Sequence, residues 1–512
     1  MPAPTAEQSG AIDSFRRGDH LVLQAGAGTG KTTTLSMIAD STGKRGRYIA
    51  FNKAIATEAA RSFPDNVQCK TMHALAYAAV GHRFKTRMDA PRVPGWKTGA
   101  ALGIGVNMHV RIGERNVSNK ALSYTVLRTV TRFCQSADPA IQRHHVPRLR
   151  GVEAEHLHAQ LVDLVLPYAN QAWQDLQNPE EGVVRFDHDH YLKHWALTQP
   201  RIDADFLLLD EAQDTNPVVE KIFNDQRDHA QLVLVGDSAQ AIYGWRGARD
   251  VMSGFDGTEL ALSQSFRFGP ALAEEANRWL GIVDAPIRLA GTPEINTRLE
   301  RVEQPDAILC RSNVGAMLEV MRLLDEGRRV ALVGGGESLR ALARAARDLQ
   351  AGKRTTHPEL ILFDSWGELQ EYAGYDPSGR DLLPLVDLVD DHGVDVILNA
   401  VDRLAVEQAS EIVVSTAHKA KGREWASVRI GEDFTEPVDQ DETDDYGDPL
   451  PGHIDDAEAR LAYVAVTRAR HQLDLGGLSW INQHPDGNPG GKRPPYASGS
   501  PSPWDLLGSS PN

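Results

Sequence analysis

The sequence predicts an α/β protein with two lobes, each built around a parallel sheet. Short apolar runs rich in valine, leucine and isoleucine end in polar or glycine-rich turns, and helical segments lie between these runs. Such alternation is typical of parallel strands that are buried on both faces. The runs form two sets that are separated along the chain, and 512 residues are more than one compact domain usually holds. We therefore expect two α/β lobes.

The expected strands follow the apolar runs in chain order. In the first lobe they are residues 20–24, 48–51, 206–210 and 231–236, and in the second lobe they are 307–310, 329–333, 360–363, 411–415 and 472–475. Residues 31–39 and 270–280 are typical of the helices that connect such strands.

Two stretches interrupt this pattern and predict insertions. Residues in the first stretch are mostly helical in character and carry scattered histidines and charges, and the second stretch is smaller. The predicted organisation is a first lobe of residues 1–82 and 205–258, a helical insertion at 83–204, a second lobe of 259–351 and 411–480, and a reduced accessory insertion at 352–410. Residues 484–512 are rich in proline, glycine, serine and asparagine, and we expect them to be disordered.

Composition excludes several classes of protein. The chain has no run of eighteen apolar residues, its first residues do not resemble a secretory signal, and its three cysteines lie far apart. These features argue against a membrane span, a disulfide framework and a zinc site. They favour the reducing cytoplasm, which we expect to be that of a bacterial cell or a phage-infected host. The net charge of −16 does not exclude nucleic acid, because a groove can be locally positive on an acidic body.

Residues 25–32 read AGAGTGKT, directly after an expected strand and before an expected helix. This context predicts a phosphate-binding loop, in which glycines let backbone N–H groups point at phosphate oxygens and the helix N-terminus favours negative charge. Lys31 is expected to reach the β and γ phosphates, and the Thr32 hydroxyl to bind Mg²⁺. Alanine replaces the first glycine of the strict pattern. The predicted nucleotide contacts of the loop are Ala25, Gly26, Ala27, Gly28, Thr29, Gly30, Lys31, Thr32 and Thr33.

Asp210 and Glu211 follow the apolar run at 206–210 in LLLDEAQD. A carboxylate at the end of a strand beside a phosphate loop can hold Mg²⁺, and an adjacent glutamate can orient and deprotonate the attacking water. We therefore expect Thr32 and Asp210 at the metal and Glu211 as the base. Lys31 and Asp210 are 179 residues apart, which places the helical insertion between them and favours a modular motor over a GTPase-type switch.

The remaining motifs complete a resemblance to superfamily 1 helicases of the UvrD/Rep type. They follow the order typical of that family: TAEQ at 5–8, YIAFNKA at 48–54, TMH at 71–73, GDSAQAIYGWRGA at 236–248, QSFRF at 264–268, TAHKAKGREW at 416–425 and LAYVAVTRAR at 461–470. Within the family, HDHYLKHWAL and FNKAIATEAARSFPDNV are most similar to the helicase core of the F-box DNA helicases, although no F-box is evident. The resemblance covers about residues 5–475 and implies two RecA-like lobes.

The resemblance assigns nucleotide contacts beyond the phosphate loop. It implies that Gln8 reads adenine, that Phe266 stacks on the base where most relatives carry tyrosine, and that Glu424, with Gly422, lies at the ribose. It further implies that Gln240 senses the γ-phosphate and that Arg267 and Arg468 stabilise the charge of the transition state. If Arg468 comes from the second lobe, hydrolysis requires the lobes to close.

The same resemblance implies a single-stranded DNA path. Aromatic side chains stack on bases without regard to sequence. The candidate DNA contacts are Phe51, Asn52, His73, Tyr243, Trp245, Arg246, Thr416 and His418. The histidine-rich run at 187–190 invites a metal interpretation, but it has no suitably spaced partners, so we favour a structural role for it.

The implied function is that of a DNA-dependent ATPase that uses ATP and Mg²⁺, moves 3′→5′ along single-stranded DNA and unwinds tailed duplex DNA in replication, repair or recombination. One alternative keeps the motor but assigns it to stripping proteins from single strands, with a recombinase or a single-strand-binding protein as partner. A second alternative is an ATP-gated DNA-binding sensor. We expect a monomer without a membrane partner.

Overall fold

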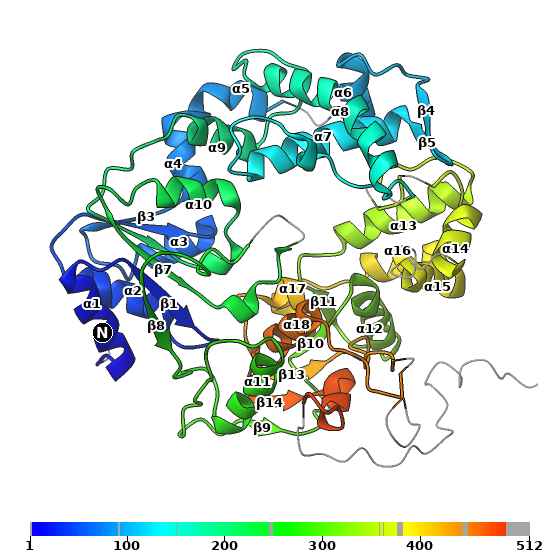
Figure 1. Cartoon of the computed structure of the whole chain (residues 1–512). Helices are drawn as coiled ribbons and strands as arrows, with labels where there is room; N and C mark the ends of the chain where they lie inside the picture. Colours follow the sequence, from blue (N-terminus) through cyan, green and yellow to red (C-terminus); the bar gives the residue numbers. More distant parts are fainter. Residues whose placement is uncertain are drawn as a thin grey trace, which may run out of the picture.

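The computed structural model describes residues 3–90, 93–149, 151–244, 249–357, 359–361, 363–375, 382–440, 442–443 and 449–487. In the view of Figure 1 the first lobe lies at the left and the second lobe below, while helical units extend from both lobes and meet at the upper right. Each lobe contains a six-stranded sheet. The predicted α/β class with two parallel sheets is therefore confirmed.

The sheet of the first lobe is parallel throughout. In spatial order its strands are β3 (Val67–Thr71), β2 (Gly46–Ala50), β6 (Phe206–Leu209), β7 (Gln231–Gly236), β1 (Leu21–Ala25) and β8 (Thr258–Leu262). The four predicted runs lie in β1, β2, β6 and β7. The two edge strands, β3 and β8, escaped prediction because their exposed polar residues hide the apolar pattern. Since β8 pairs with β1, the first sheet extends past the boundary predicted at residue 258.

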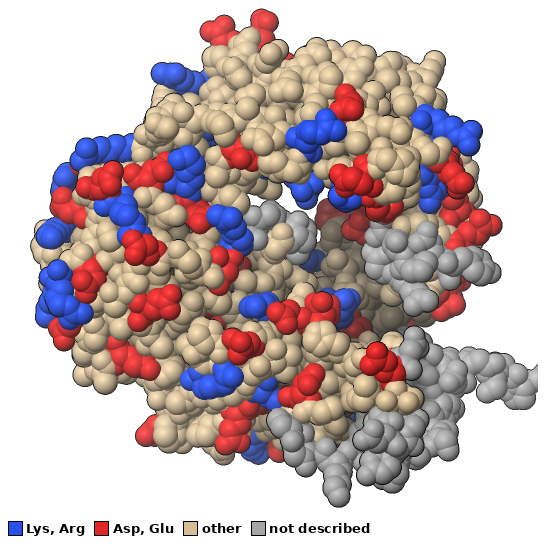
Figure 2. Space-filling view, viewed as in Figure 1, with Lys and Arg blue, Asp and Glu red and all other residues tan. Residues whose placement is uncertain are grey.

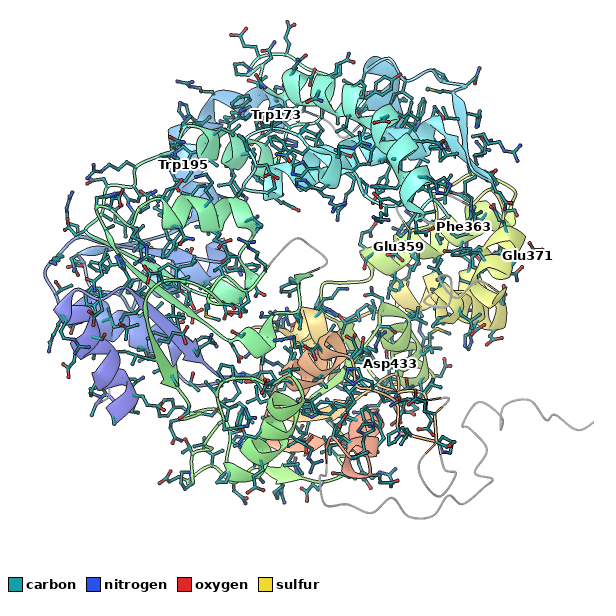
Figure 3. All side chains as sticks on the ribbon, viewed as in Figure 1. Trp173, Trp195, Glu359, Phe363, Glu371 and Asp433 are labelled. Atoms are coloured by element: carbon teal, nitrogen blue, oxygen red, sulfur yellow. The ribbon has the colours of Figure 1, made fainter. Side chains whose placement is uncertain are left out.

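The sheet of the second lobe is also parallel. Its spatial order is β11 (Val330–Leu332), β12 (Ile412–Thr416), β10 (Ala307–Cys310), β13 (Trp425–Ile430), β14 (Ala469–Asp474) and β9 (Arg298–Leu299). The strand predicted at 360–363 was wrong, because residues 359–361 form a turn. Leu360 and Phe363 are instead buried in the core of the second lobe and its accessory helices. Figure 3 shows Phe363 among these helices. A short apolar run has the same composition in a buried turn as in a buried strand.

Helices cover both sheets, and several of them begin at a side-chain cap. Thr5 and Gln8 form a reciprocal capping box at the start of the first helix, which fixes Gln8 close to the phosphate loop. The first-lobe helices are α1 (Ala6–Arg17), α2 (Lys31–Asp40), α3 (Lys53–Ala59), α4 (Met72–Ala79) and α10 (Pro217–Asn224). The second-lobe helices are α11 (Pro270–Ile282), α12 (Asn313–Asp325), α13 (Glu337–Gln350), α17 (Ala417–Ala420) and α18 (Asp456–Val466). No helix in the described ranges is long and apolar enough to cross a membrane.

The helical insertion shares its core with the first lobe. Apolar side chains of the insertion and of the strands β1, β2, β6 and β7 belong to one buried cluster. The elements of the insertion are η1 (Gly81–Phe84), α5 (Lys85–Met88), α6 (Gly95–Ala101), the hairpin β4 (His109–Ile112) and β5 (Arg115–Ser118), α7 (Asn119–Gln135), α8 (Glu155–Leu176) and α9 (His188–Leu197). The insertion and the first lobe are thus joined by continuous packing.

The accessory insertion is joined to the second lobe in the same way. Its helices α14 (Trp366–Tyr375), α15 (Leu383–His392) and α16 (Val394–Asp402) pack with α12 and α13, and their apolar side chains share a core with Ile308 and Val414 of the sheet. The accessory insertion is therefore an extension of the second lobe.

The two insertions touch at one end of the molecule. Arg115 on β5 lies 3.5 Å from Glu368 on α14, and its guanidinium lies 5.7 Å from the ring centre of Tyr372. This contact completes a circuit of protein around a central hollow, which the space-filling view shows with both basic and acidic side chains on its rim (Figure 2).

The start of the predicted tail is packed against the second lobe. His484 is buried, and its Nε2 lies 2.9 Å from the carbonyl oxygen of Gly452. The disorder predicted for 484–512 is therefore wrong for residues 484–487, and the remainder of the tail lies outside the described residues.

The buried Arg87 joins separate segments of the helical insertion, and its contacts predict an effect on stability. The Arg87 guanidinium pairs with Asp175 at 2.8 Å and also donates to the carbonyl oxygens of Asp175, Asn178 and Val184. We expect Arg87→Met to lower the free energy of unfolding by about 3–5 kcal/mol, because it leaves a largely buried carboxylate without its partner. Urea denaturation measures this loss. The exposed Arg83→Met is the matched control, and equal midpoints for the two variants would contradict the assignment.

Candidate functional site

The phosphate loop connects β1 to α2 in a conformation that depends on glycine. Gly28 and Gly30 have φ angles of 76° and 74°. A side chain at Gly28 would also collide with Ser265 Oγ and Arg267 Cβ, each at 2.6 Å from its Cβ position. Lys31 Nζ lies 3.4 Å from the Gly26 carbonyl oxygen and points back over the loop. The other predicted loop residues follow in line: Ala25 ends β1, Ala27 is buried, Thr29 donates to the Gly26 carbonyl, and Thr33 lies exposed on α2.

Oxygen ligands suited to Mg²⁺ meet at the end of this loop. Thr32 Oγ1 donates to Asp210 Oδ2 at 3.1 Å, and the Tyr48 hydroxyl donates to the same oxygen at 2.5 Å. Burial and the neighbouring Glu211 raise the pKa of Asp210. A buried carboxylate whose charge is disfavoured in this way gains from a cation, and hydroxyl and carboxylate oxygens are ligands that Mg²⁺ accepts. The donor set therefore fits the metal.

Glu211 is held in an unusual backbone conformation beside Asp210. Its φ angle is 52°, and its side chain accepts a hydrogen bond from Gln213. Burial acts to raise the pKa of Glu211, but the positive charges of Lys31 and Lys421 outweigh burial and lower it. Glu211 thus stays ionised, which is the state that a general base requires.

Residues predicted at the adenine converge beside the loop. Gln8 Nε2 donates to Thr34 Oγ1 at 3.0 Å, and a Cβ built on Gly30 would lie 3.7 Å from both Gln8 Nε2 and the Phe266 ring. The Phe266 N–H donates to the Gly28 carbonyl oxygen at 2.8 Å, while the ring is half exposed. A planar base can therefore reach an amide and an aromatic face together.

Arg267 and Arg468 approach the site from the side of the second lobe. Arg267 Nε donates to Glu424 at 2.8 Å, and its NH1 donates to the carbonyl oxygen of Thr467. Arg468 is buried, and its NH2 lies 3.3 Å from Gln240 Oε1 of the first lobe. Burial and the nearby Arg267 lower the pKa of Arg468 to about 9. A bound anion beside Arg468 would offset the free-energy cost of burying its positive charge.

Tyr463, which the sequence did not single out, joins the two lobes at the phosphate loop. The hydroxyl of Tyr463 on α18 accepts the N–H of Ala27 at 3.1 Å and donates to Asp237 Oδ2 at 2.9 Å. Tyr463 is fully buried, and Asp237 also accepts a hydrogen bond from Gln240. LAYVAVTRAR contained Tyr463, but its role depends on a contact across 436 residues that no local pattern reveals.

Lys421 is a second residue that the sequence did not single out. It follows α17 in the second lobe, and its Nζ pairs with Asp214 of the first lobe at 2.5 Å. Both side chains are buried, and burial raises the pKa of Asp214 to about 6 in spite of Lys421. Next to it, Gly422 has a φ angle of 81° and turns the chain toward Glu424.

The residues predicted to contact single-stranded DNA include an aromatic pair and two helix caps. Phe51 and Tyr243 lie with parallel rings, 9° apart in plane and 6.4 Å between centroids, and the Tyr243 hydroxyl donates to the carbonyl oxygen of His418. Asn52 and Thr416 cap the N-termini of α3 and α17. Trp245 and Arg246 lie outside the described residues.

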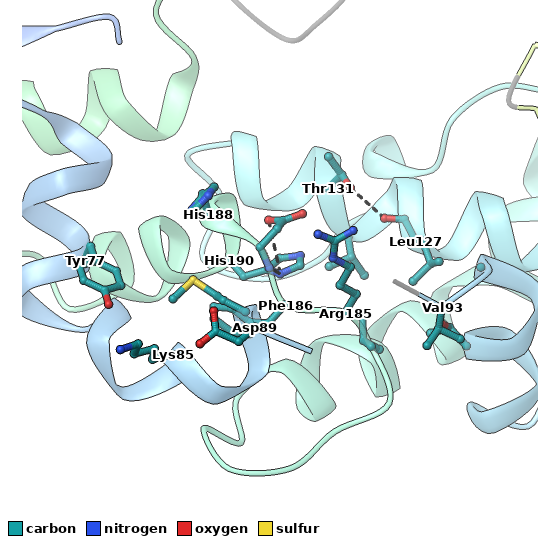
Figure 4. Close-up of a pocket in the computed structure, with 16 residues that line it drawn as sticks. Tyr77, Lys85, Asp89, Val93, Leu127, Thr131, Arg185, Phe186, His188 and His190 are labelled. Atoms are coloured by element: carbon teal, nitrogen blue, oxygen red, sulfur yellow. Dashed lines mark hydrogen bonds and ion pairs between the residues drawn. The ribbon is translucent and has the colours of Figure 1, made fainter. Parts of the chain in front are cut away.

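The histidines near α9 make structural contacts. His73 Nε2 lies 3.1 Å from Asp189, whose other oxygen accepts from Gln135. His190 Nδ1 accepts the N–H of Asp187 in a cap at the start of α9, and His188 contacts the Tyr191 hydroxyl. The same helix lines an 870 Å³ pocket inside the helical insertion (Figure 4).

Asp138, His144 and His145 form a cluster with the composition of a metal site. Both histidine Nε2 atoms lie near Asp138 Oδ2, at 2.9 and 3.1 Å. However, His145 Nδ1 accepts the N–H of Gln142 at 2.8 Å, so a neutral His145 carries its proton on Nε2. That nitrogen has no lone pair for a metal, and hydrogen bonding accounts for the cluster.

His145 gives a prediction about pH. Its pKa is lowered to about 4, chiefly by burial and next by His144. Because the folded pKa lies below the unfolded one, this residue stabilises the fold above pH 6.5, and the stabilisation is lost as the pH falls toward 4. We expect the loss between pH 7 and pH 4 to be up to about 3 kcal/mol smaller in His145→Gln. Urea unfolding across this range measures it. Exposed His156→Gln serves as the control, and parallel curves for wild type and His145→Gln would refute the assignment.

The fold and the site together define a class of protein. A phosphate loop, a Thr32–Asp210 pair whose oxygens fit Mg²⁺, and arginines from a second lobe meet where the lobes join. These are the parts of a two-lobed phosphate-loop NTPase.

Comparisons with known proteins indicate which kind of phosphate-loop NTPase the chain resembles. Residues 8–246 match the AAA domain, and residues 337–480 match the UvrD-like helicase C-terminal domain. The chain is 29% identical to F-box DNA helicase protein 1 of Schizosaccharomyces pombe and 28% identical to F-box DNA helicase 1 of Gallus gallus, over 92% of its length in both cases. It covers 57% and 48% of these relatives, or about half their length. Together these similarities support a UvrD-like superfamily 1 helicase core in this chain.

Proposed function

We propose that this chain is an ATP-dependent translocase on single-stranded DNA and a DNA helicase. The observation that carries the proposal is the contact of α18 with the phosphate loop. Tyr463 and Arg468 of the second lobe meet Ala27 and Gln240 of the first lobe, so a bound triphosphate lies where both lobes act on it. The curated relatives, whose names describe DNA helicases, support DNA as the partner.

The residues around the cleft have separate roles in hydrolysis. Lys31 and the N–H groups of the loop bind the β and γ phosphates, and Gln8 and Phe266 hold the base. Glu211 takes a proton from the attacking water. Mg²⁺, when held by Thr32 and Asp210, neutralises charge on the phosphate oxygens.

Arg468 makes catalysis depend on the position of the second lobe. Its guanidinium stabilises the negative charge that develops on the γ-phosphate oxygens, with Arg267 beside it. Product release removes that charge and weakens the attraction between the lobes. Phe51 belongs to the first lobe, and Tyr243 donates to His418 of the second, so lobe movement changes the surface on which bases stack.

Movement 3′→5′ and action on tailed duplexes are part of the proposal. The names of the relatives, which describe DNA helicases, support unwinding as the main task. We assign this task to replication, repair or recombination. Removal of a recombinase or single-strand-binding protein uses the same motor and is the second candidate task. Strand displacement on 3′- and 5′-tailed duplexes, compared with clearance of a recombinase filament, separates the two tasks and tests the polarity.

The motor predicts strong stimulation of ATP hydrolysis by single-stranded DNA. We expect Lys31→Ala and Glu211→Gln to abolish turnover and strand displacement while the fold persists, because one removes the phosphate contact and the other the base. Steady-state ATPase with and without oligo(dT) measures this, with circular dichroism as a check on folding. Strand displacement by either variant would exclude the motor and favour an ATP-gated DNA sensor.

Arg468→Ala tests the requirement for closure. We expect it to reduce the DNA-stimulated rate by about 10³–10⁵, the range that arginine fingers usually contribute. The exposed Arg470→Ala on the neighbouring strand is the matched control. A loss of less than tenfold in Arg468→Ala would remove this arginine from the catalytic step.

A further inference from the structure

We propose that Lys421 is the positioning residue through which a base stacked on Tyr243 acts on Glu211. The inference rests on the proposed function and adds to it a physical route from the strand to the hydrolytic carboxylate. The route consists of Tyr243, Lys421, Asp214 and Glu211, and it crosses between the lobes.

The position of Lys421 is fixed by the helix before it. Ala417 and Ala420 of α17 are fully buried in a core that also contains Ala239 and Ile242 of the first lobe. The Lys421 side chain therefore leaves α17 directly into the interface between the lobes.

Three groups surround the Lys421 ammonium, which has three N–H bonds to offer. Its Nζ lies 2.5 Å from Asp214 Oδ2, 2.6 Å from the carbonyl oxygen of Gln240 and 5.4 Å from the centroid of the Tyr243 ring. These partners come from two segments of the first lobe, because Gln240 and Tyr243 are only three residues apart. A shift of the Tyr243 ring therefore changes the surroundings of the same ammonium that holds Asp214.

Because the Lys421–Asp214 pair is buried, separating its two side chains is energetically unfavourable. The side chains of Lys421 and Asp214 are 8% and 2% exposed, and Asp214 Oδ1 has no hydrogen-bond partner among the described residues. Separating the ammonium from its carboxylate would leave a buried charge without compensation. Lys421 and Asp214 therefore move together when either is displaced.

Asp214 is one short turn from the base. The 3₁₀ turn η3 (Ala212–Asp214) begins directly after Glu211, whose φ angle of 52° is fixed by that turn, and Gln213 of the turn donates to the Glu211 carboxylate. Displacement of Asp214 thus reorients Glu211 relative to the attacking water. Small changes in the position of a catalytic group alter rates strongly.

The strand reaches the other end of the route through Tyr243. This ring lies parallel to Phe51 and contacts Lys421 as a cation–π partner. Stacking of a base changes the position of the ring, and the ammonium follows it because ring and charge attract each other. Through Lys421, the binding of DNA therefore changes the position of Glu211.

The first experiment compares Lys421→Met with Lys419→Met in the full chain. Lys419 lies on α17, two residues before Lys421, but contacts Asn313 of the second lobe. ATPase is measured against oligo(dT) concentration, which gives the maximal stimulation and the concentration for half-maximal stimulation. We expect Lys421→Met to lower the ratio of stimulated to unstimulated rate by about tenfold, within the usual range of coupling between sites. The half-maximal concentration should change little, and Lys419→Met should match wild type.

A double-mutant cycle tests the route itself. If Tyr243 acts through Lys421, Tyr243→Leu combined with Lys421→Met should lower maximal stimulation no further than the more severe single variant. Multiplying losses, or wild-type stimulation in Lys421→Met, would overturn the inference. Absence of stimulation in the wild-type protein would instead overturn the proposed function.

A second variant separates coupling from stability. Lys421→Met leaves the buried Asp214 carboxyl without its cationic partner, whereas Lys421→Met with Asp214→Asn removes both members of the pair. We expect this pair to recover the urea midpoint lost in the single variant and to remain poorly stimulated by DNA. Recovery of stimulation together with stability would show that Lys421 serves only the fold.

Discussion

The buried hydroxyl group of Tyr463 joins the two lobes at the phosphate loop, and the arrangement of the nucleotide site depends on that contact. Tyr463 receives the N–H of Ala27 and donates to Asp237, so a helix of the second lobe is attached to the loop that surrounds the phosphates. Apolar side chains from both lobes close around this point and exclude water. Hydrogen bonds to charged groups in such surroundings contribute about 1.5–3 kcal/mol each. The position of the second lobe is therefore set where the nucleotide chemistry takes place.

Charge is organised locally in a way that the total charge conceals. The protein carries a net charge of −16, yet Lys31, Lys421 and Arg468 gather around the carboxylates of the cleft. Each cation is balanced by a nearby carboxylate or a carbonyl oxygen, so the cleft is neither strongly basic nor strongly acidic. Its response to an anionic ligand depends on these distances and on burial. Overall composition therefore carries little information about the partner of such a site.

Sequence motifs predicted those parts of the site whose residues lie next to one another in the chain. AGAGTGKT and the carboxylate at Asp210 lie at the ends of buried strands, and the fold brings them within hydrogen-bonding distance through Thr32. Edge strands β3 and β8 were missed because exposed polar residues interrupt them, and the run at 360–363 was misassigned because burial among helices requires the same residues as burial in a sheet. Lys421 and Tyr463 could not be found from sequence, since their partners are 207 and 436 residues away.

The contact of Arg115 with Glu368 and Tyr372 has a topological consequence. Each helical insertion shares a core with its own lobe, so any rotation of the lobes about the nucleotide also changes the separation of these side chains. Both partners are more than one-third exposed, and ion pairs of that kind contribute less than about 1 kcal/mol. A polymer that lies in the hollow is encircled while the contact persists. A circular single strand of DNA has no free end to pass through the hollow. It can enter or leave the hollow only when the contact of Arg115 with Glu368 and Tyr372 is broken.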